Sequence, residues 1–191
     1  MKIALVSDIH ADAKALRRVF DDLPSVDRVL CAGDAVSEFR FCPDTVDLLR
    51  QHKVQCIQGN HEHVLFNANP GYLAKCRAEY AADLLDHLAE APTSIDIEAA
   101  GAKLHMIHAT PWEPFSGYIV PGSPKLARIG TLPYDFVVLG HTHVPMVETA
   151  GHVTIINPGS CSQPRDGGRE GSYAILDLEM RTATIRRLRL G

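Results

Sequence analysis

Acidic and histidine side chains recur in this sequence at the points where short apolar runs end. Each run is typical of a buried strand, and in open α/β sheets ligands bind at the carboxyl ends of the strands. A single histidine beside a strand has little meaning, but five such groups in 191 residues favour one shared site. The groups are Asp8 with His10, Asp34, Asn60 with His61, His108, and His141 with His143.

Two of the groups are pairs of residues separated by one position, Asp8 with His10 and His141 with His143. In extended backbone, side chains at i and i+2 point the same way, so we expect each pair to present two ligands to one place. Three of the groups are preceded by a glycine, which lets the chain turn sharply as it leaves a strand. These glycines are Gly33, Gly59 and Gly140.

The donors in this set are carboxylate, amide and imidazole groups, without an obvious thiolate. Such donors suit Mn²⁺, Fe, Co²⁺, Ni²⁺ or Zn²⁺ rather than a soft metal. Their number is enough for two divalent cations that share a carboxylate. Two-metal sites clamp the attacking and leaving oxygens of an in-line displacement, and a water bridging two dications is strongly acidified. The reaction that such a site suits best is hydrolysis of a phosphate ester.

The elements that must position these groups alternate between strand and helix in the first third of the chain. This order predicts βαβ units around a parallel sheet, with Asp44 as the N-cap of the second helix. The expected elements are a strand at Ile3–Val6, a helix at Ala11–Leu23, a strand at Val26–Cys31, a helix at Asp44–His52 and a strand at Val54–Ile57.

The rest of the chain predicts one long helix, Tyr72–Glu90, followed by strands that we expect to form a second, largely antiparallel sheet packed on the first. Thr110–Pro124 is a proline-rich stretch with three aromatic residues, typical either of a lid or substrate wall or of a plain surface loop. No linker or repeat divides the chain, so we expect a single domain over residues 1–191. The expected later strands are Ile95–Glu98, Lys103–Ile107, Phe136–Leu139, Val144–Thr149, Val153–Ile156, Tyr173–Leu178 and Thr182–Leu188.

Composition narrows the class of protein further. The net charge of −4 argues against a dedicated nucleic-acid binder, which would carry a basic face. The apolar run near the first residue is too short for a secretory signal or a membrane span. The five cysteines are odd in number, scattered and without a CxxC pair, so we expect free thiols and a cytoplasmic location. The sequence gives no signal of the oligomeric state.

Taken together, six short motifs resemble the calcineurin-like metallophosphoesterase superfamily, and within it the small prokaryotic phosphodiesterase branch. They occur in the order of the family and cover most of the chain. The motifs are SDIHA (Ser7–Ala11), AGDAV (Ala32–Val36), GNHE (Gly59–Glu62), MIHAT (Met106–Thr110), GHTH (Gly140–His143) and NPGS (Asn157–Ser160).

The resemblance implies an α/β fold, a four-layer α/β/β/α sandwich of two packed mixed sheets flanked by helices. It also implies two divalent metal ions, with Mn²⁺ favoured, and hydrolysis by attack of a metal-bridging hydroxide on phosphorus. His61 would not be a ligand but would stabilise the phosphoryl charge or protonate the leaving oxygen. One ion would be held by Asp8, His10 and His143, the other by Asn60, His108 and His141, and both by Asp34.

Departures from the family pattern limit what carries over. Asp34 is not followed by the Asp-Arg-Gly run of protein phosphatases, which favours small phosphodiesters over phosphoproteins, with phosphomonoesters left open. Ala109 stands where the family often has glycine, a small change that should be tolerated. Arg165 lies close enough to the last motif to reach a substrate phosphate, although a solvated surface arginine is an equal interpretation.

Two other classes of protein fit the sequence less well than a phosphoesterase. A binding or scaffold protein on the same fold would tend to lack metal ligands or the motif histidine, whereas every such position is filled here. A metallo-β-lactamase-like hydrolase needs an HxHxDH run, which this sequence lacks. A set of aromatic side chains could stack a base or aryl group of the substrate, or could simply belong to the core and rim. These are Phe39, Phe41, Trp112, Phe115 and Tyr118.

Overall fold

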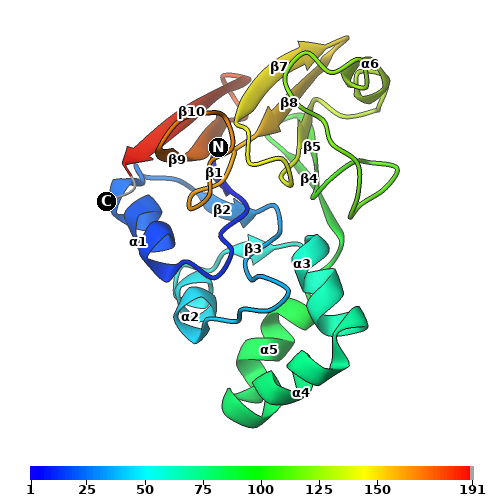
Figure 1. Ribbon diagram of the computed structural model, residues 1–191. Helices are drawn as coiled ribbons and strands as arrows, with labels where there is room; N and C mark the ends of the chain where they lie inside the picture. The colour runs from blue at the N-terminus through cyan, green and yellow to red at the C-terminus, as the bar shows by residue number, and fades with distance from the viewer. Residues whose placement is uncertain (190–191) are drawn as a thin grey trace.

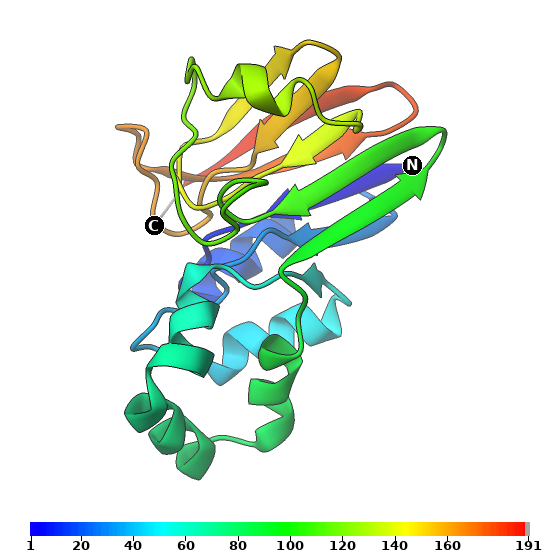
Figure 2. The same cartoon turned by 90° about the vertical axis from the view of Figure 1, so that its right-hand side faces the viewer.

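Two five-stranded sheets lie face to face in the computed structural model, which describes residues 1–189 (Figures 1 and 2). The first sheet has the order β10 (Thr182–Arg189), β9 (Glu170–Asp177), β1 (Lys2–Val6), β2 (Arg28–Cys31), β3 (Gln55–Cys56). The second has the order β4 (Ser94–Ala99), β5 (Ala102–Ile107), β6 (Phe136–Val138), β8 (Val153–Asn157), β7 (Met146–Ala150).

Strand β1 lies in the middle of the first sheet and is covered on both faces. Ile3 and Leu5 belong to the apolar cluster between the two sheets, whereas Ala4 and Val6 belong to the cluster beneath the helices. All four side chains are fully buried. The uninterrupted apolar run of the sequence therefore has the predicted cause, since neither face of the strand meets water.

Helices α1 (Ala13–Asp22) and α2 (Pro43–Gln51) cover the outer face of the first sheet. Helix α1 begins where the Asp12 carboxylate accepts a hydrogen bond from the Ala15 N–H at 2.9 Å. The N-cap of α2 is Cys42, so the prediction of Asp44 in that position was wrong. Pro43 takes the first helical position, which its fixed φ favours, and Asp44 falls in the first turn, where a negative charge is stabilised by the helix dipole.

The helical segment after β3 is made of several pieces: α3 (Asn60–His63), a π-helical turn (Val64–Ala68), α4 (Pro70–Glu79) and α5 (Ala82–Ala89). The predicted single helix over Tyr72–Glu90 is therefore broken, with Tyr80 and Ala81 in extended conformation. The break turns α5 back toward the sheet, where Leu85 and Leu88 are buried in the helix-side core. Packing of these leucines thus overrides the local helix preference.

The later strands divide between the two sheets. Strands β9 and β10 return to the first sheet, where β9 pairs antiparallel with β1. In the second sheet, β5–β6 and β6–β8 are parallel, while β4–β5 and β7–β8 are antiparallel. The prediction that all later strands form one largely antiparallel sheet was wrong, because the last hairpin, β9 and β10, pairs with the edge of β1 that faces away from β2. Both sheets are mixed, as the family resemblance implies.

The fourth layer consists of α6 (Leu126–Ile129) and the segment before it, which cover the outer face of the second sheet. Ile119, Leu126 and Ile129 pack there against Val137 and Ile155. The layers are thus helices, sheet, sheet, and a short helix with its loop, the α/β/β/α order expected. Within residues 1–189, no helix combines the length and apolar character needed to cross a membrane.

Candidate metal centre

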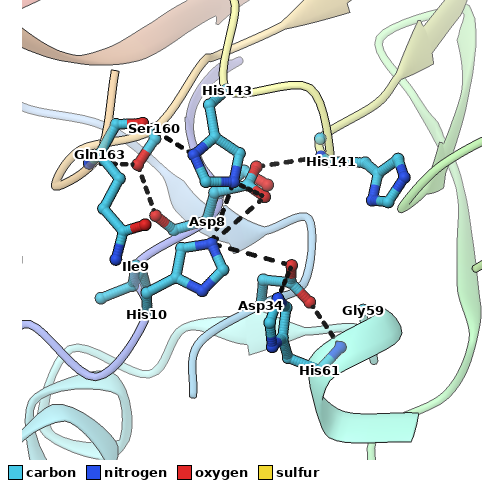
Figure 3. A network of polar contacts seen from close by, with 12 residues as sticks. Asp8, Ile9, His10, Asp34, Gly59, His61, His141, His143, Ser160 and Gln163 are labelled. Atoms are coloured by element: carbon cyan, nitrogen blue, oxygen red, sulfur yellow. Dashed lines mark hydrogen bonds and ion pairs between the residues drawn. The ribbon is translucent and has the colours of Figure 1, made fainter. Parts of the chain in front are cut away.

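The carboxyl ends of five strands from both sheets meet at one edge of the sandwich, and the predicted ligands lie there (Figure 3). Asp8 follows β1, Asp34 follows β2 and Asn60 follows β3, while His108 follows β5 and His141 follows β6. The loops are bonded to one another, for example by the Asp8 N–H to the Gly33 carbonyl at 3.0 Å and the His10 N–H to the Asp34 carbonyl at 2.9 Å. Loops that are far apart in the sequence are thus held in fixed positions relative to one another.

Asp8, His10 and His143 form the first of two donor groups. Nε2 of His10 lies 3.0 Å from Nε2 of His143, and Oδ1 of Asp8 lies 3.3 Å from the same His143 nitrogen. Oδ1 of Asp8 is 3.9 Å from Nε2 of His10. The three donor atoms therefore face one small volume, in which a single cation could be held.

Asn60, His108 and His141 form the second group. The Asn60 side-chain oxygen lies 2.8 Å from Nδ1 of His141 and 3.1 Å from Nε2 of His108. Asp34 stands between the two groups, because its Oδ2 is 3.3 Å from Nε2 of His108 and 3.9 Å from Nε2 of His10. One carboxylate is thus within reach of both donor groups.

Hydrogen bonds behind the histidines fix which ring nitrogen faces the centre. Nδ1 of His108 lies 2.7 Å from the Ala32 carbonyl oxygen, and Nδ1 of His143 lies 2.7 Å from the Gln163 carbonyl oxygen. A carbonyl only accepts, so each Nδ1 carries the hydrogen and donates it. The lone pair of each neutral ring is then on Nε2 and points into the centre, the arrangement that metal-binding histidines use.

The backbone reaches this arrangement by a different route from the one expected. Asp8 and His10 have φ of 53° and 51°, and His141 and His143 have φ of 67° and 59°. The two pairs therefore do not lie in extended backbone, and the predicted reason for their convergence was wrong. Asp34 also has a positive φ, 54°, so five of the seven candidate ligands adopt the left-handed conformation. Strained backbone of this kind concentrates at functional sites.

The donor set fits divalent cations. Oδ1 of Asp8 is buried and makes no hydrogen bond to any of residues 1–189, an arrangement that is costly unless the oxygen binds something else. Two nitrogens at right angles on one cation, each at about 2.1 Å, would be about 3 Å apart, which matches the spacing of His10 and His143. The unpaired Asp8 oxygen and the spacing of the two histidine nitrogens are therefore both consistent with a bound cation.

The charges of the site point the same way. Burial lowers the pKa of His10 to about 3 and the pKa of His141 and His143 to about 4, so all three are neutral and able to ligate near pH 7. Burial would also lower the pKa of His108, but the Asp34 carboxylate outweighs it and raises this pKa to about 10. In the absence of a cation, the buried acidic groups thus favour a proton on His108. A metal ion bound to this histidine would replace that proton.

Glu62 is a residue whose function the sequence analysis missed. Its buried carboxylate accepts the backbone N–H groups of Asp34 at 2.9 Å, Val36 at 2.9 Å and Gly59 at 2.8 Å. Burial and the nearby Asp34 charge raise the pKa of Glu62 to about 7, and the hydrogen bonds from Val36 and Gly59 oppose that rise. Glu62 therefore fixes the loop that carries Asp34 to the loop that carries Asn60. Its place in the GNHE motif was the available signal.

The NPGS motif supports the centre from the other side. The Ser160 hydroxyl donates to the Asp8 carbonyl at 2.6 Å (Figure 3). The Asn157 amide donates to the Gly140 carbonyl at 2.7 Å and to the Thr142 hydroxyl at 3.0 Å. These buried side chains hold the backbone on which Asp8 and His141 stand.

His61 and Arg165 lie at the border of the centre. Nε2 of His61 is 3.8 Å from Oδ2 of Asp34, and the Glu38 N–H donates to Nδ1 of His61 at 3.0 Å. Nδ1 is therefore an acceptor, and the hydrogen of the neutral ring is on Nε2, facing Asp34. Arg165 is exposed, and its N–H donates to the His143 carbonyl at 3.2 Å. Burial lowers the pKa of His143 to about 4, and the positive charge of Arg165 adds to this effect.

Gly59 is required by space rather than by its φ of −97°. A Cβ at this position would lie 2.2 Å from Oδ1 of Asp34 and 2.6 Å from its nitrogen, well inside contact distance. We expect Gly59→Ala to displace Asp34 and to lower kcat/KM by about tenfold to a hundredfold, since a misplacement of about 1 Å has effects of this size. The measurement is steady-state turnover of a phosphoester by the metal-loaded variant.

The matched control for this prediction is Gly71→Ala. A Cβ at Gly71 meets nothing within 4 Å, and the residue lies in the first turn of α4. Wild-type kcat/KM in both alanine variants would show that the contact between Gly59 and Asp34 has no bearing on turnover.

The layer order and the cluster at the sheet ends define an α/β sandwich with a candidate site for two metal ions. The chain belongs to the calcineurin-like phosphoesterase superfamily, whose domain model matches residues 1–181. It is similar to the crystal structure of a metallophosphoesterase from Sphaerobacter thermophilus, with 26% identity, a TM-score of 0.80, and coverage of 100% of this chain and 90% of that one.

Similarity to known sequences is of two kinds. A probable metallophosphoesterase of Methanothermobacter thermautotrophicus is 27% identical over 86% of this chain and 80% of its own length. The phosphodiesterase YfcE of Escherichia coli strain K12 is 49% identical, but only over 43 residues, which are 22% of this chain and 23% of that protein. The first similarity extends along the chain, whereas the second is local.

Proposed function

We propose that this protein is a dinuclear metal-dependent phosphoesterase that hydrolyses small phosphodiesters. The observation that carries the proposal is the arrangement of six donors in two groups of three, with the Asp34 carboxylate as a seventh donor between them. Membership of the phosphoesterase superfamily gives the reaction class. The local similarity to a protein named a phosphodiesterase supports the diester over the monoester.

Each side chain has a proposed role. Two divalent cations, with Mn²⁺ favoured and Fe, Zn²⁺, Co²⁺ or Ni²⁺ as alternatives, would supply the positive charge that acidifies water and neutralises phosphoryl oxygens. His61 directs its Nε2 hydrogen toward the reacting phosphate, and Arg165 contributes a donor fork at the border of the site. The first ion would be held by Asp8, His10 and His143, the second by Asn60, His108 and His141, and both by Asp34.

The cysteines support the proposed cytoplasmic location. All five lie within the described residues and are free thiols, four of them buried. Unpaired thiols are usual in a reducing compartment.

The proposal is tested with protein freed of metal and reloaded with each divalent cation in turn. We expect about two ions to bind per chain and bis(p-nitrophenyl) phosphate to be hydrolysed, fastest with Mn²⁺, and faster than the monoester p-nitrophenyl phosphate. Metal content is measured by elemental analysis and turnover by nitrophenolate release.

Two results would contradict the proposal in different ways. Tight binding of two ions without turnover of any phosphoester would favour a binding or scaffold protein on the same fold. Failure to bind any of the cations would show that the donor groups are not a metal centre.

A further inference from the structure

Tyr118 lies against a candidate metal ligand and yet remains largely in water. Its ring stacks on the imidazole of His141 with the centroids 4.6 Å apart and the planes 25° from parallel. The residue is nevertheless 59% exposed. One face of the phenol ring is therefore covered by a side chain of the centre, and much of the remaining surface is open to solvent beside it.

The loop that carries Tyr118 is held on both sides of this residue. Before it, Phe115 stacks on His63 of helix α3 with a centroid distance of 4.3 Å. After it, Ile119 is 1% exposed and belongs to the core beneath α6. Farther back, Thr110 and Glu113 exchange backbone hydrogen bonds of 3.2 Å. Tyr118 is therefore presented by a fixed segment, and little freedom remains to be lost when a ligand binds.

A second exposed aromatic side chain, Phe39, belongs to a segment that is bonded to the centre, and its ring lies 6.3 Å from that of Tyr72. Phe39 is 67% exposed and lies in a segment bonded to two residues of the centre. The Glu38 N–H donates to His61, and the Arg40 guanidinium donates to the His10 carbonyl. Among residues 1–189, Phe39 and Tyr118 are the aromatic members of the set of exposed large apolar side chains; Tyr118 stacks on His141, and both chain neighbours of Phe39 bond to the centre. Exposed rings in this position suit a ligand with a flat organic group.

We propose that Tyr118 is a substrate-binding residue that stacks a planar aromatic group of the phosphodiester, such as a nucleobase or an aryl ring. This inference rests on the proposed function, because the phosphate must lie at the metal centre for its ester group to reach Tyr118. The site then prefers aryl and nucleoside esters over alkyl esters. Stacking of a base on an aromatic side chain typically changes binding by about tenfold or more when the ring is removed.

The test compares two inhibitors that differ only in the base, adenosine 5′-monophosphate and ribose 5-phosphate. Inhibition constants are measured against hydrolysis of bis(p-nitrophenyl) phosphate by the Mn²⁺-loaded protein. Tyr118→Leu keeps an apolar side chain over His141 but removes the ring. We expect Tyr118→Leu to raise the inhibition constant for adenosine 5′-monophosphate by about tenfold and to leave that for ribose 5-phosphate unchanged. In Tyr118→Phe, which keeps the ring, both inhibition constants should equal those of the wild type.

Other outcomes overturn the inference. Equal increases for both inhibitors would mean that Tyr118 only positions His141, and no increase for either would mean that no base contacts it. Met180→Leu, at an exposed residue in the turn between β9 and β10, controls for the exchange of an exposed apolar side chain for leucine away from the centre. If the wild-type protein hydrolyses the ester but Tyr118→Leu leaves the ratio of the two inhibition constants unchanged, only this inference is rejected. If the wild-type protein itself shows no turnover, the proposed function is rejected.

Discussion

The Asp34→Asn variant should lose phosphodiester hydrolysis almost completely and bind fewer metal ions than the wild type. Oδ1 of Asp34 accepts the His61 N–H at 3.0 Å, which the amide oxygen of asparagine can still do. Its other oxygen, the one directed at His108 and His10, becomes an NH₂ group that cannot bind a cation. Both donor groups then lose their shared carboxylate, so the fall in kcat should exceed the roughly 100-fold to 1000-fold effect of removing one transition-state-stabilising group.

The measurements for Asp34→Asn are metal content per chain, kcat and the thermal midpoint of the metal-free protein. The midpoint should fall, because the Asp34 carboxylate faces the protonated, buried His108 in the metal-free protein and the substitution removes that charge pair. Asp83→Asn is the matched control, since Asp83 lies far from the centre in sequence and makes a solvent-exposed ion pair with Arg50 that stabilises the fold little. Two ions per chain and normal turnover in Asp34→Asn would rule out the bridging role.

The second large effect is expected for His61→Gln. The variant should bind metal ions normally while kcat falls by about 100-fold to 10,000-fold, the range for loss of a general acid–base group. Normal binding follows from the geometry, because His61 contacts the Asp34 carboxylate through its backbone N–H, which glutamine retains. The side chain itself directs Nε2 at the centre and is a quarter exposed.

A series of leaving groups separates the two roles proposed for His61. If Nε2 protonates the leaving oxygen, the loss in His61→Gln should be small for p-nitrophenyl esters, whose leaving group needs no proton, and large for alkyl esters. If Nε2 stabilises the phosphoryl charge, the loss should be the same for both. His152→Gln, in the exposed turn between β7 and β8, serves as the control. Unchanged kcat for every ester in His61→Gln would remove His61 from the mechanism.

The sequence predicted the places where the site would form better than it predicted the fold around them. Short apolar runs such as Ile3–Val6 mark strands because both faces must be buried, and a polar residue marks the point where burial ends. That signal is local, so it placed Asp8, Asp34 and His141 at strand ends. The division of the ligands between two ions came from the family resemblance and remains a proposal.

Features that depend on distant contacts were not predictable in the same way. No local pattern in strands β9 and β10 assigns them to one sheet or the other, and their pairing follows from the edge of β1 that is left free on the side away from β2. The break at Tyr80 has neither glycine nor proline, and it follows from the packing of Leu85 and Leu88. The role of Glu62 depends on three N–H groups that converge only in the folded chain.

The left-handed backbone at five candidate ligand positions narrows the choice of amino acids there for a reason separate from metal binding. Asp, Asn and His tolerate positive φ far better than bulky or β-branched residues do. These same three types also supply the oxygen and nitrogen donors that hard and borderline cations prefer. Backbone conformation and coordination chemistry therefore favour nearly the same amino-acid types at these positions, which are Asp8, His10, Asp34, His141 and His143. A relative that had lost its metal ions could keep such a residue because the backbone of the turn requires it. The presence of the residue alone would therefore not show that the relative is an active enzyme.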